Sequence, residues 1–197
     1  VSSRPVAGQV RVMKHPASRE FFAYWDEKRG LNPAPDRSEL EPGPVRELLG
    51  DIFVLSYDPA AGYPFRVAGT RVCALLGKDL KGEEFSGLFQ PASRIEIEDI
   101  LDAVIADKLA AVVGVTACNS DGRPIPLELL LLPFNTRAHM PISLTGLMVP
   151  FVEGCHALTD LTLTSWRYMG PPPQRFAPRV LRKLTLARGL MVYEGLV

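Results

Sequence analysis

Side chains that could do chemistry are scattered along the sequence and do not fall at the spacing of a known catalytic motif. The three histidines, His15, His139 and His156, lie in separate segments. His139 stands in an expected loop, where its imidazole could ligate haem or a metal ion, but no second ligand follows at a suitable spacing. The nucleotide-binding glycine motifs and the G-x-S-x-G nucleophile motif are also missing from the sequence. We therefore expect no catalytic residues, no metal and no cofactor.

Three other groups could carry chemistry, and each has a plainer interpretation that the sequence favours. Cys73 could be a flavin-reactive or redox thiol, but on a short apolar helix a buried structural cysteine is more common. The acids between Glu96 and Asp102 could imitate a paired-carboxylate site, but on a helix they form a solvated face. The basic residues of 175–188 could touch nucleic acid, but with one aromatic residue nearby a solvated or strand-pairing tail is favoured.

The overall composition excludes several classes of protein. The 197 residues carry 22 Lys and Arg against 22 Asp and Glu, and this balance argues against a general nucleic-acid or membrane-surface binder. The longest stretch without charge, residues 138–152, contains two prolines and is too short to cross a bilayer. Three cysteines give no disulfide framework, which favours a reducing compartment. We expect a cytoplasmic protein with no membrane partner and no nucleic-acid partner.

The helices that would position these side chains follow from periodicity and capping residues. Residues 16–29 predict an amphipathic helix, because Phe21, Phe22 and Trp25 form an aromatic stripe among charged residues. A longer helix is expected to begin at Ser93, since the run Ser93–Glu96 has the pattern of a capping box and apolar residues follow at helical spacing.

The strands predict the fold class. They are expected at residues 51–57, 65–68, 111–118, 125–134 and 142–152, with a hairpin turn at Asn119–Gly122. The helices are inserted between the second and the third strand. This order predicts an α+β fold with a five-stranded antiparallel sheet and an N-terminal amphipathic helix. We divide the chain into a flexible arm (1–14), one domain (15–168), and a Pro-rich linker with a basic tail (169–197).

Both faces of the expected sheet are apolar, so both must be covered. In residues 125–134 leucines occur on each face, whereas a one-sided antiparallel sheet would alternate apolar with polar residues. Helix 16–29 could cover the second face, but such a helix is about 21 Å long and about 10 Å wide, which leaves room for a second copy. We therefore expect a homodimer. The expected interface comprises Phe21, Phe22, Trp25, Leu130, Leu132, Val149 and Phe151.

Several runs of residues resemble a known family. They are Phe65–Gly77 (FRVAGTRVCALLG), Leu80–Gly82, Gly122-Arg123 with Leu127–Pro133 (LELLLLP), and Leu158–Leu163 with Trp166-Arg167. Together with the order of elements, they resemble a PAS domain, and more closely a PAS-like family of single-domain alphaproteobacterial proteins. The resemblance covers about residues 15–168 and implies a sensory or regulatory fold. The N-C-R-F-L-Q signature of flavin photoreceptors and a haem-ligating helix histidine are missing from the sequence, so neither light nor oxygen sensing is implied.

The resemblance leads to a functional hypothesis. We expect a non-enzymatic signalling module that acts through contacts with a protein partner, with a small apolar ligand as a further possibility. The ligand pocket would lie between the inner sheet face and the helices, although the same residues would serve equally as plain core. Its expected lining comprises Phe53, Leu55, Phe65, Val67, Val72, Leu76, Leu101, Val104, Leu129 and Leu131.

Two alternatives remain open at the level of sequence. A ligand-free interaction adaptor would have a filled core and a partner-binding sheet face. An enzyme using the same cavity would need a titratable group inside it. On the expected sheet, Glu128 is the candidate, and strand alternation places it on the outer face. The enzyme is therefore the least favoured of the three hypotheses.

Overall fold

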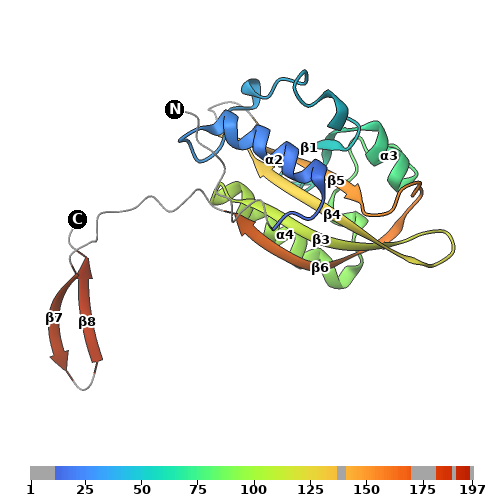
Figure 1. Cartoon of the computed structure of the whole chain (residues 1–197). Helices are drawn as coiled ribbons and strands as arrows, with labels where there is room; N and C mark the ends of the chain where they lie inside the picture. Colours follow the sequence, from blue (N-terminus) through green and yellow to red (C-terminus); the bar gives the residue numbers. More distant parts are fainter. Residues whose placement is uncertain (1–11, 137–140, 170–180, 188–189, 196–197) are drawn as a thin grey trace.

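The computed structural model of the chain describes residues 12–136, 141–169, 181–187 and 190–195 (Figure 1). Its α-helices are α2 (Pro16–Arg29), α3 (Thr70–Leu76) and α4 (Pro91–Ala106). Its strands are β1 (Ile52–Ser56), β2 (Phe65–Ala68), β3 (Ala110–Cys118), β4 (Pro124–Pro133), β5 (Ser143–Pro150), β6 (Thr159–Met169), β7 (Leu181–Ala187) and β8 (Leu190–Gly195). Within these residues, every helix is too short or too polar to span a bilayer.

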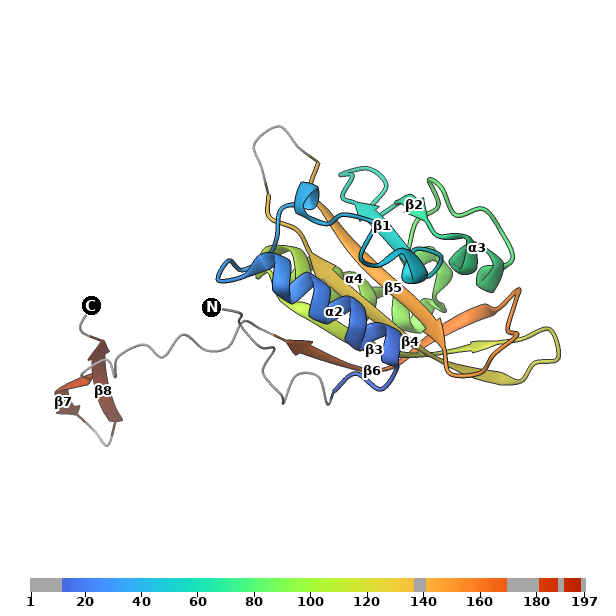
Figure 2. The same cartoon turned by 45° about the horizontal axis from the view of Figure 1, so that its top comes forward.

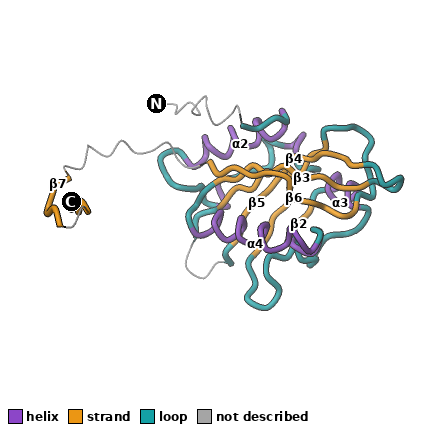
Figure 3. The backbone as a smooth tube through the Cα atoms, turned by 90° about the horizontal axis from the view of Figure 1, so that it is seen from below, coloured by secondary structure: helices purple, strands orange, loops and turns teal. Residues whose placement is uncertain are grey.

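Strands β1 to β6 form one antiparallel sheet in the order β2-β1-β5-β4-β3-β6. Helices α3 and α4 pack on one face, which we call the inner face, and α2 packs on the opposite, outer face (Figures 2 and 3). The expected α+β fold, with helices inserted between the second and the third strand, is confirmed.

The sheet has six strands rather than the expected five. Strand β6 pairs with β3 at the edge of the sheet, where Ser165 lies opposite Gly114. Alternation could not predict β6, because all five residues from Thr164 to Tyr168 are exposed and so mark no buried face. The segment expected to be only a linker and a tail also contains a hairpin formed by β7 and β8.

Helix α4 begins two residues earlier than its sequence predicted. Pro91 occupies the first turn, where a missing backbone N–H costs nothing, and Gln90 is the N-cap. Ser93 therefore lies inside the helix and does not cap it. Its hydroxyl instead accepts a hydrogen bond from the backbone N–H of Leu163 at 3.1 Å, which joins α4 to β6.

Two hydrophobic clusters hold the layers together, one on each face of the sheet. The inner cluster packs α3 and α4 against strands β1 to β6, and the outer cluster packs α2 mainly against β4 and β5, with further residues from β3 and β6. Gly146 shows how closely the inner layer is packed. A Cβ atom at this position would lie 2.3 Å from the Cζ atom of Phe53, the residue opposite it on β1. Only glycine fits beneath this ring.

Candidate functional site

Nine of the ten residues expected to line a ligand pocket lie together on the inner face and are 0–7% exposed. The exception is Val67, which is 51% exposed. A β-bulge shifts the register here, so that Phe65 pairs with Leu55 but Val67 pairs with Val54. Because a bulge breaks the alternation of side chains, Val67 does not follow Phe65 onto the inner face. Val67 is therefore excluded from this lining. The nine residues are Phe53, Leu55, Phe65, Val72, Leu76, Leu101, Val104, Leu129 and Leu131.

Aromatic side chains fill the space between the inner face and the helices. The ring centroid of Phe85 lies 5.4 Å from that of Phe53 and 5.5 Å from those of Phe65 and Phe89. All four side chains are at most 2% exposed. The nine buried residues thus belong to one buried hydrophobic cluster.

A hydrogen bond between two side chains lies at the edge of this core. The hydroxyl of Tyr63 donates a hydrogen bond to the Asp102 carboxylate on α4. Burial, together with this carboxylate, raises the pKa of Tyr63 well above its ordinary value. The phenol therefore stays protonated at neutral pH, and the contact links α4 to the loop before β2.

The aromatic stripe of α2 covers the outer face of its own sheet. Trp25 is buried, stacks on Phe22 at 5.9 Å, and donates its indole N–H to the Pro133 carbonyl at 3.0 Å. Six of the seven residues expected to form a dimer interface are buried in this way within one chain, and only Phe151 is exposed. The physical reason is that a helix placed on β4 and β5 already buries these side chains. In this fold the stripe is a core contact and does not offer a surface to a second copy.

Glu128 fixes the start of α2 on the sheet. Its side chain lies on the outer face, as alternation predicted, and is almost fully buried. One carboxylate oxygen accepts the backbone N–H of Lys14 at 2.7 Å and the other accepts that of His15 at 2.9 Å. His15 is the N-cap of α2, so the negative charge also lies at the positive end of the helix dipole.

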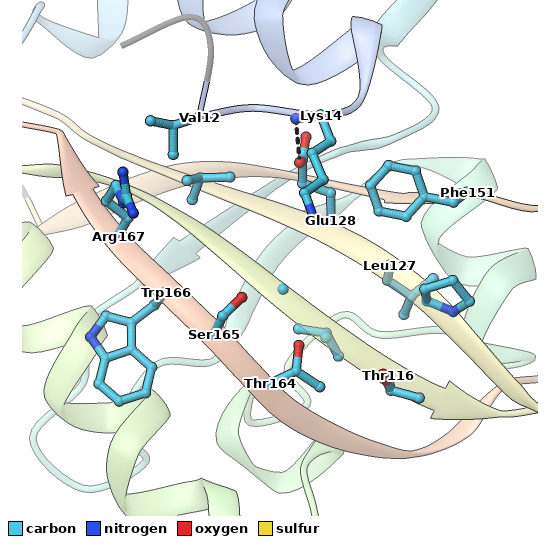
Figure 4. Close-up of a pocket in the computed structure, with 14 residues that line it drawn as sticks. Val12, Lys14, Thr116, Leu127, Glu128, Phe151, Thr164, Ser165, Trp166 and Arg167 are labelled. Carbon is cyan, nitrogen blue, oxygen red and sulfur yellow. Dashed lines mark hydrogen bonds between the residues drawn. The ribbon is translucent and has the colours of Figure 1, made fainter. Parts of the chain in front are cut away.

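Beside the start of α2, the outer face carries a groove of about 540 Å³ (Figure 4). The cluster beneath helix α2 involves β4, β5 and the ends of β3 and β6 at Ala110 and Met169. The groove lies farther along the sheet, around Gly114 on β3, Glu128 on β4 and Ser165 on β6. Hydroxyl groups line its floor around Gly114, and apolar side chains form part of its wall. The lining comprises Val12, Lys14, Val112, Gly114, Val115, Thr116, Pro126, Leu127, Glu128, Phe151, Thr164, Ser165, Trp166 and Arg167.

The free charge of the groove is positive. Lys14 and Arg167 are both exposed, and neither takes part in an ion pair among the described residues. Glu128 is the one acid in the lining, so the two cations and this carboxylate together give the lining a formal charge of +1. The sequence did not indicate this site, because its parts come from three strands and from the segment before α2.

The other chemical candidates do not come together. His139 lies outside the described residues, and within the described part of the chain no three metal-ligating side chains cluster. Cys73 is partly buried against the inner core, as a structural cysteine would be. The acids of α4 are exposed, and the Asp102 carboxylate accepts a hydrogen bond from the Tyr63 hydroxyl. Of the basic tail, Arg182 and Lys183 lie on β7.

Three comparisons relate the chain to known proteins. A family model described as a PAS domain matches residues 13–149, from just before α2 to the end of β5. No curated protein matches the chain. Among solved structures, a LOV protein of Rhodobacter sphaeroides is 16% identical with a TM-score of 0.42; the match covers 55% of this chain and 66% of that one, slightly less than two thirds. A PAS domain from Colwellia psychrerythraea is 13% identical with a TM-score of 0.40. This match covers 56% of the present chain and 98% of the Colwellia chain.

The extent of the family match decides the classification. It spans more than half of the chain and includes helices α2 to α4 and strands β1 to β5. Strand β6, which contributes to the groove, lies beyond it. The resemblance noted from the sequence is confirmed, and the chain belongs to the PAS domain family.

Proposed function

We propose that this chain is a non-enzymatic regulatory module that acts by binding a protein partner at the outer-face groove. Domains of the PAS family are typically sensory, and the family match supports that general character. Because a fold does not determine a function, the argument depends on the surface of this particular chain. The observation that carries the proposal is the contrast between the two faces of the sheet, since buried apolar side chains lie under helices on the inner face and a groove lies on the outer face.

The uncovered part of the outer face has the character of a contact surface. From Thr164 to Tyr168, strand β6 is exposed on both faces, and β3 flanks it on only one side. Phe151, at the border of the groove, is 43% exposed. An edge strand that shares a groove with an exposed aromatic residue is typical of surfaces that pair with another protein.

A ligand held in the interior has less support. The residues nominated to line such a pocket are packed against one another, with four phenylalanine rings between them. A bound apolar molecule would have to displace these rings, which would cost free energy because close packing would be lost. The proposal therefore favours the ligand-free form of the regulatory hypothesis.

Photo-crosslinking tests the proposal. A benzophenone amino acid replaces Ser165, which is exposed in the groove, and the full chain is expressed in its host of origin. A matched control places the same group at Lys81, an exposed residue in the loop after α3. We expect a discrete protein adduct from position 165 and none from position 81. The adduct should disappear when Thr116→Trp fills the groove.

Two results would contradict the proposal. One is equal adducts from positions 165 and 81, or an adduct that persists with Thr116→Trp, because the groove would then have no special role. The other is no adduct at all together with a small molecule that co-purifies in native mass spectrometry, because the chain would then act through its interior.

A further inference from the structure

We infer that the groove binds an extended acidic segment of the partner protein. The inference rests on the proposed function and specifies the chemistry of its partner. Its first support is electrostatic. The side chains of Lys14 and Arg167 border one groove, and neither takes part in an ion pair among the described residues. Glu128 is the one acid in the lining, and its single negative charge still leaves the lining with a formal charge of +1.

The chain itself does not supply the missing negative charge from its two ends. Residues 1–13 contain arginines and no acid, and residues 170–197 contain five basic residues and one acid, Glu194. These two segments therefore offer little negative charge to Lys14 and Arg167. Charge complementarity of this kind steers encounter and excludes partners of the wrong sign.

The form of the groove favours an extended segment. Thr116, Thr164 and Ser165 place hydroxyl groups along the floor, where they can bond to peptide N–H and C=O groups. At Gly114 the floor carries no side chain, and a Cβ atom there would lie 2.7 Å from the Ser165 hydroxyl. An extended peptide can alternate an acidic side chain toward the cations with an apolar side chain toward Phe151.

A nucleic acid fits the same surface less well. Single strands are held by many cations and by stacking on aromatic rings. This groove offers two cations, and the side chain of Trp166 points away from Lys14 and Glu128, toward the other side of the sheet (Figure 4). The zero net charge of the chain agrees with a protein partner.

Fluorescence anisotropy with defined probes tests the inference on the full chain. The probes are a labelled short peptide of alternating Val and Glu, the same peptide with Lys in place of Glu, and a labelled oligouridine. We expect only the Glu peptide to bind, and Arg167→Glu and Lys14→Glu each to weaken it about tenfold. Arg167→Glu should in turn bind the Lys peptide. The matched control Lys81→Glu should bind the Glu peptide as the native chain does.

Several outcomes would overturn the inference. They are equal binding of the Glu and Lys peptides, loss of binding in Lys81→Glu, and tight binding of oligouridine. Self-association that Arg167→Glu abolishes, seen by light scattering, would assign the groove to a second copy instead. If a charge-reversed variant fails to fold, Arg167→Gln and Lys14→Gln give the same comparison with smaller changes.

The two proposals can fail separately. If the Glu peptide does not bind but position 165 still gives its specific adduct, the partner is not acidic and the proposed function stands. If the adduct is also missing, both proposals are wrong.

Discussion

The side-chain carboxylate of Glu128 accepts the backbone N–H of His15 at 2.9 Å, although the two residues are 113 positions apart in the sequence. The contact joins the N-cap of α2 to the middle of β4. It places the helix over β4 and β5 and makes the preceding segment, with Lys14, one side of the groove. One buried acid thus connects the cover of the sheet with the proposed contact surface.

Glu128→Gln should lower the free energy of unfolding by about 1–3 kcal/mol. The reason is that both oxygens of Glu128 accept N–H groups, and the amide NH2 of glutamine would face one of these donors. Urea denaturation measures the change. Glu27→Gln, the same substitution at an exposed position on α2, serves as the control and should stay within about 0.5 kcal/mol of the native chain. Equal effects of the two substitutions would exclude the anchoring role of Glu128.

Trp25→Glu should lower the free energy of unfolding by more than about 3 kcal/mol, because it places an unpaired charge in the outer cluster and removes the bond to Pro133. Trp166→Glu, at a residue that is 46% exposed, should have little effect. Thermal melting and light scattering are measured together. A Trp25→Glu chain that stays folded and changes only from dimer to monomer would instead support the interface expected from the sequence.

Ser93→Ala should act on β6 rather than on the start of α4. The substitution removes the acceptor of the Leu163 N–H group, so hydrogen exchange at Leu163 should accelerate. The loss of one such bond should cost about 0.5–1.5 kcal/mol. Ser120→Ala, in the exposed turn between β3 and β4, is the control. Faster exchange confined to the first turn of α4 would mean that Ser93 caps the helix after all.

Tyr63→Phe should cost about 0.5–1.5 kcal/mol at neutral pH, where it removes the bond to Asp102. Since the pKa of Tyr63 is raised in the folded state, the stability that this phenol contributes is complete below its ordinary pKa of about 10. It is lost as the pH rises above that value, because only the unfolded chain then releases the proton. The difference between the native chain and Tyr63→Phe should therefore shrink between about pH 10 and 11 in urea denaturation curves. A difference that grows in this range would contradict the raised pKa.

Much of the fold could be predicted from the sequence, because the residue patterns that mark its helices and turns are local. The aromatic stripe of residues 16–29 marked α2, and the turn at Asn119–Gly122 marked the hairpin, in which the Gly122 N–H bonds to the Asn119 carbonyl at 2.9 Å. The remaining features depend on contacts between distant segments. The bulge that turns Val67 outward depends on pairing with β1, and β6 has no buried face along Thr164–Tyr168.

The candidate site was harder to predict than the fold for the same reason. Periodicity indicated that the outer face needs a cover, but it could not tell whether the same chain or a second copy supplies it. Glu128 was correctly placed on the outer face, whereas its partners are backbone groups, which no side-chain pattern reveals. The groove combines residues of β3, β4 and β6 with the segment before α2, so it depends on contacts between distant parts of the sequence.

Hydrogen exchange on the complex with the partner captured through position 165 tests the central claim most directly. If the outer-face groove is the contact surface, partner binding should slow amide exchange along Thr164–Tyr168 and at Lys14. The amides of α3 and of the phenylalanine-rich inner face should exchange at unchanged rates. Protection confined to α3, α4 and the inner face, with β6 exchanging as in the free chain, would contradict the account.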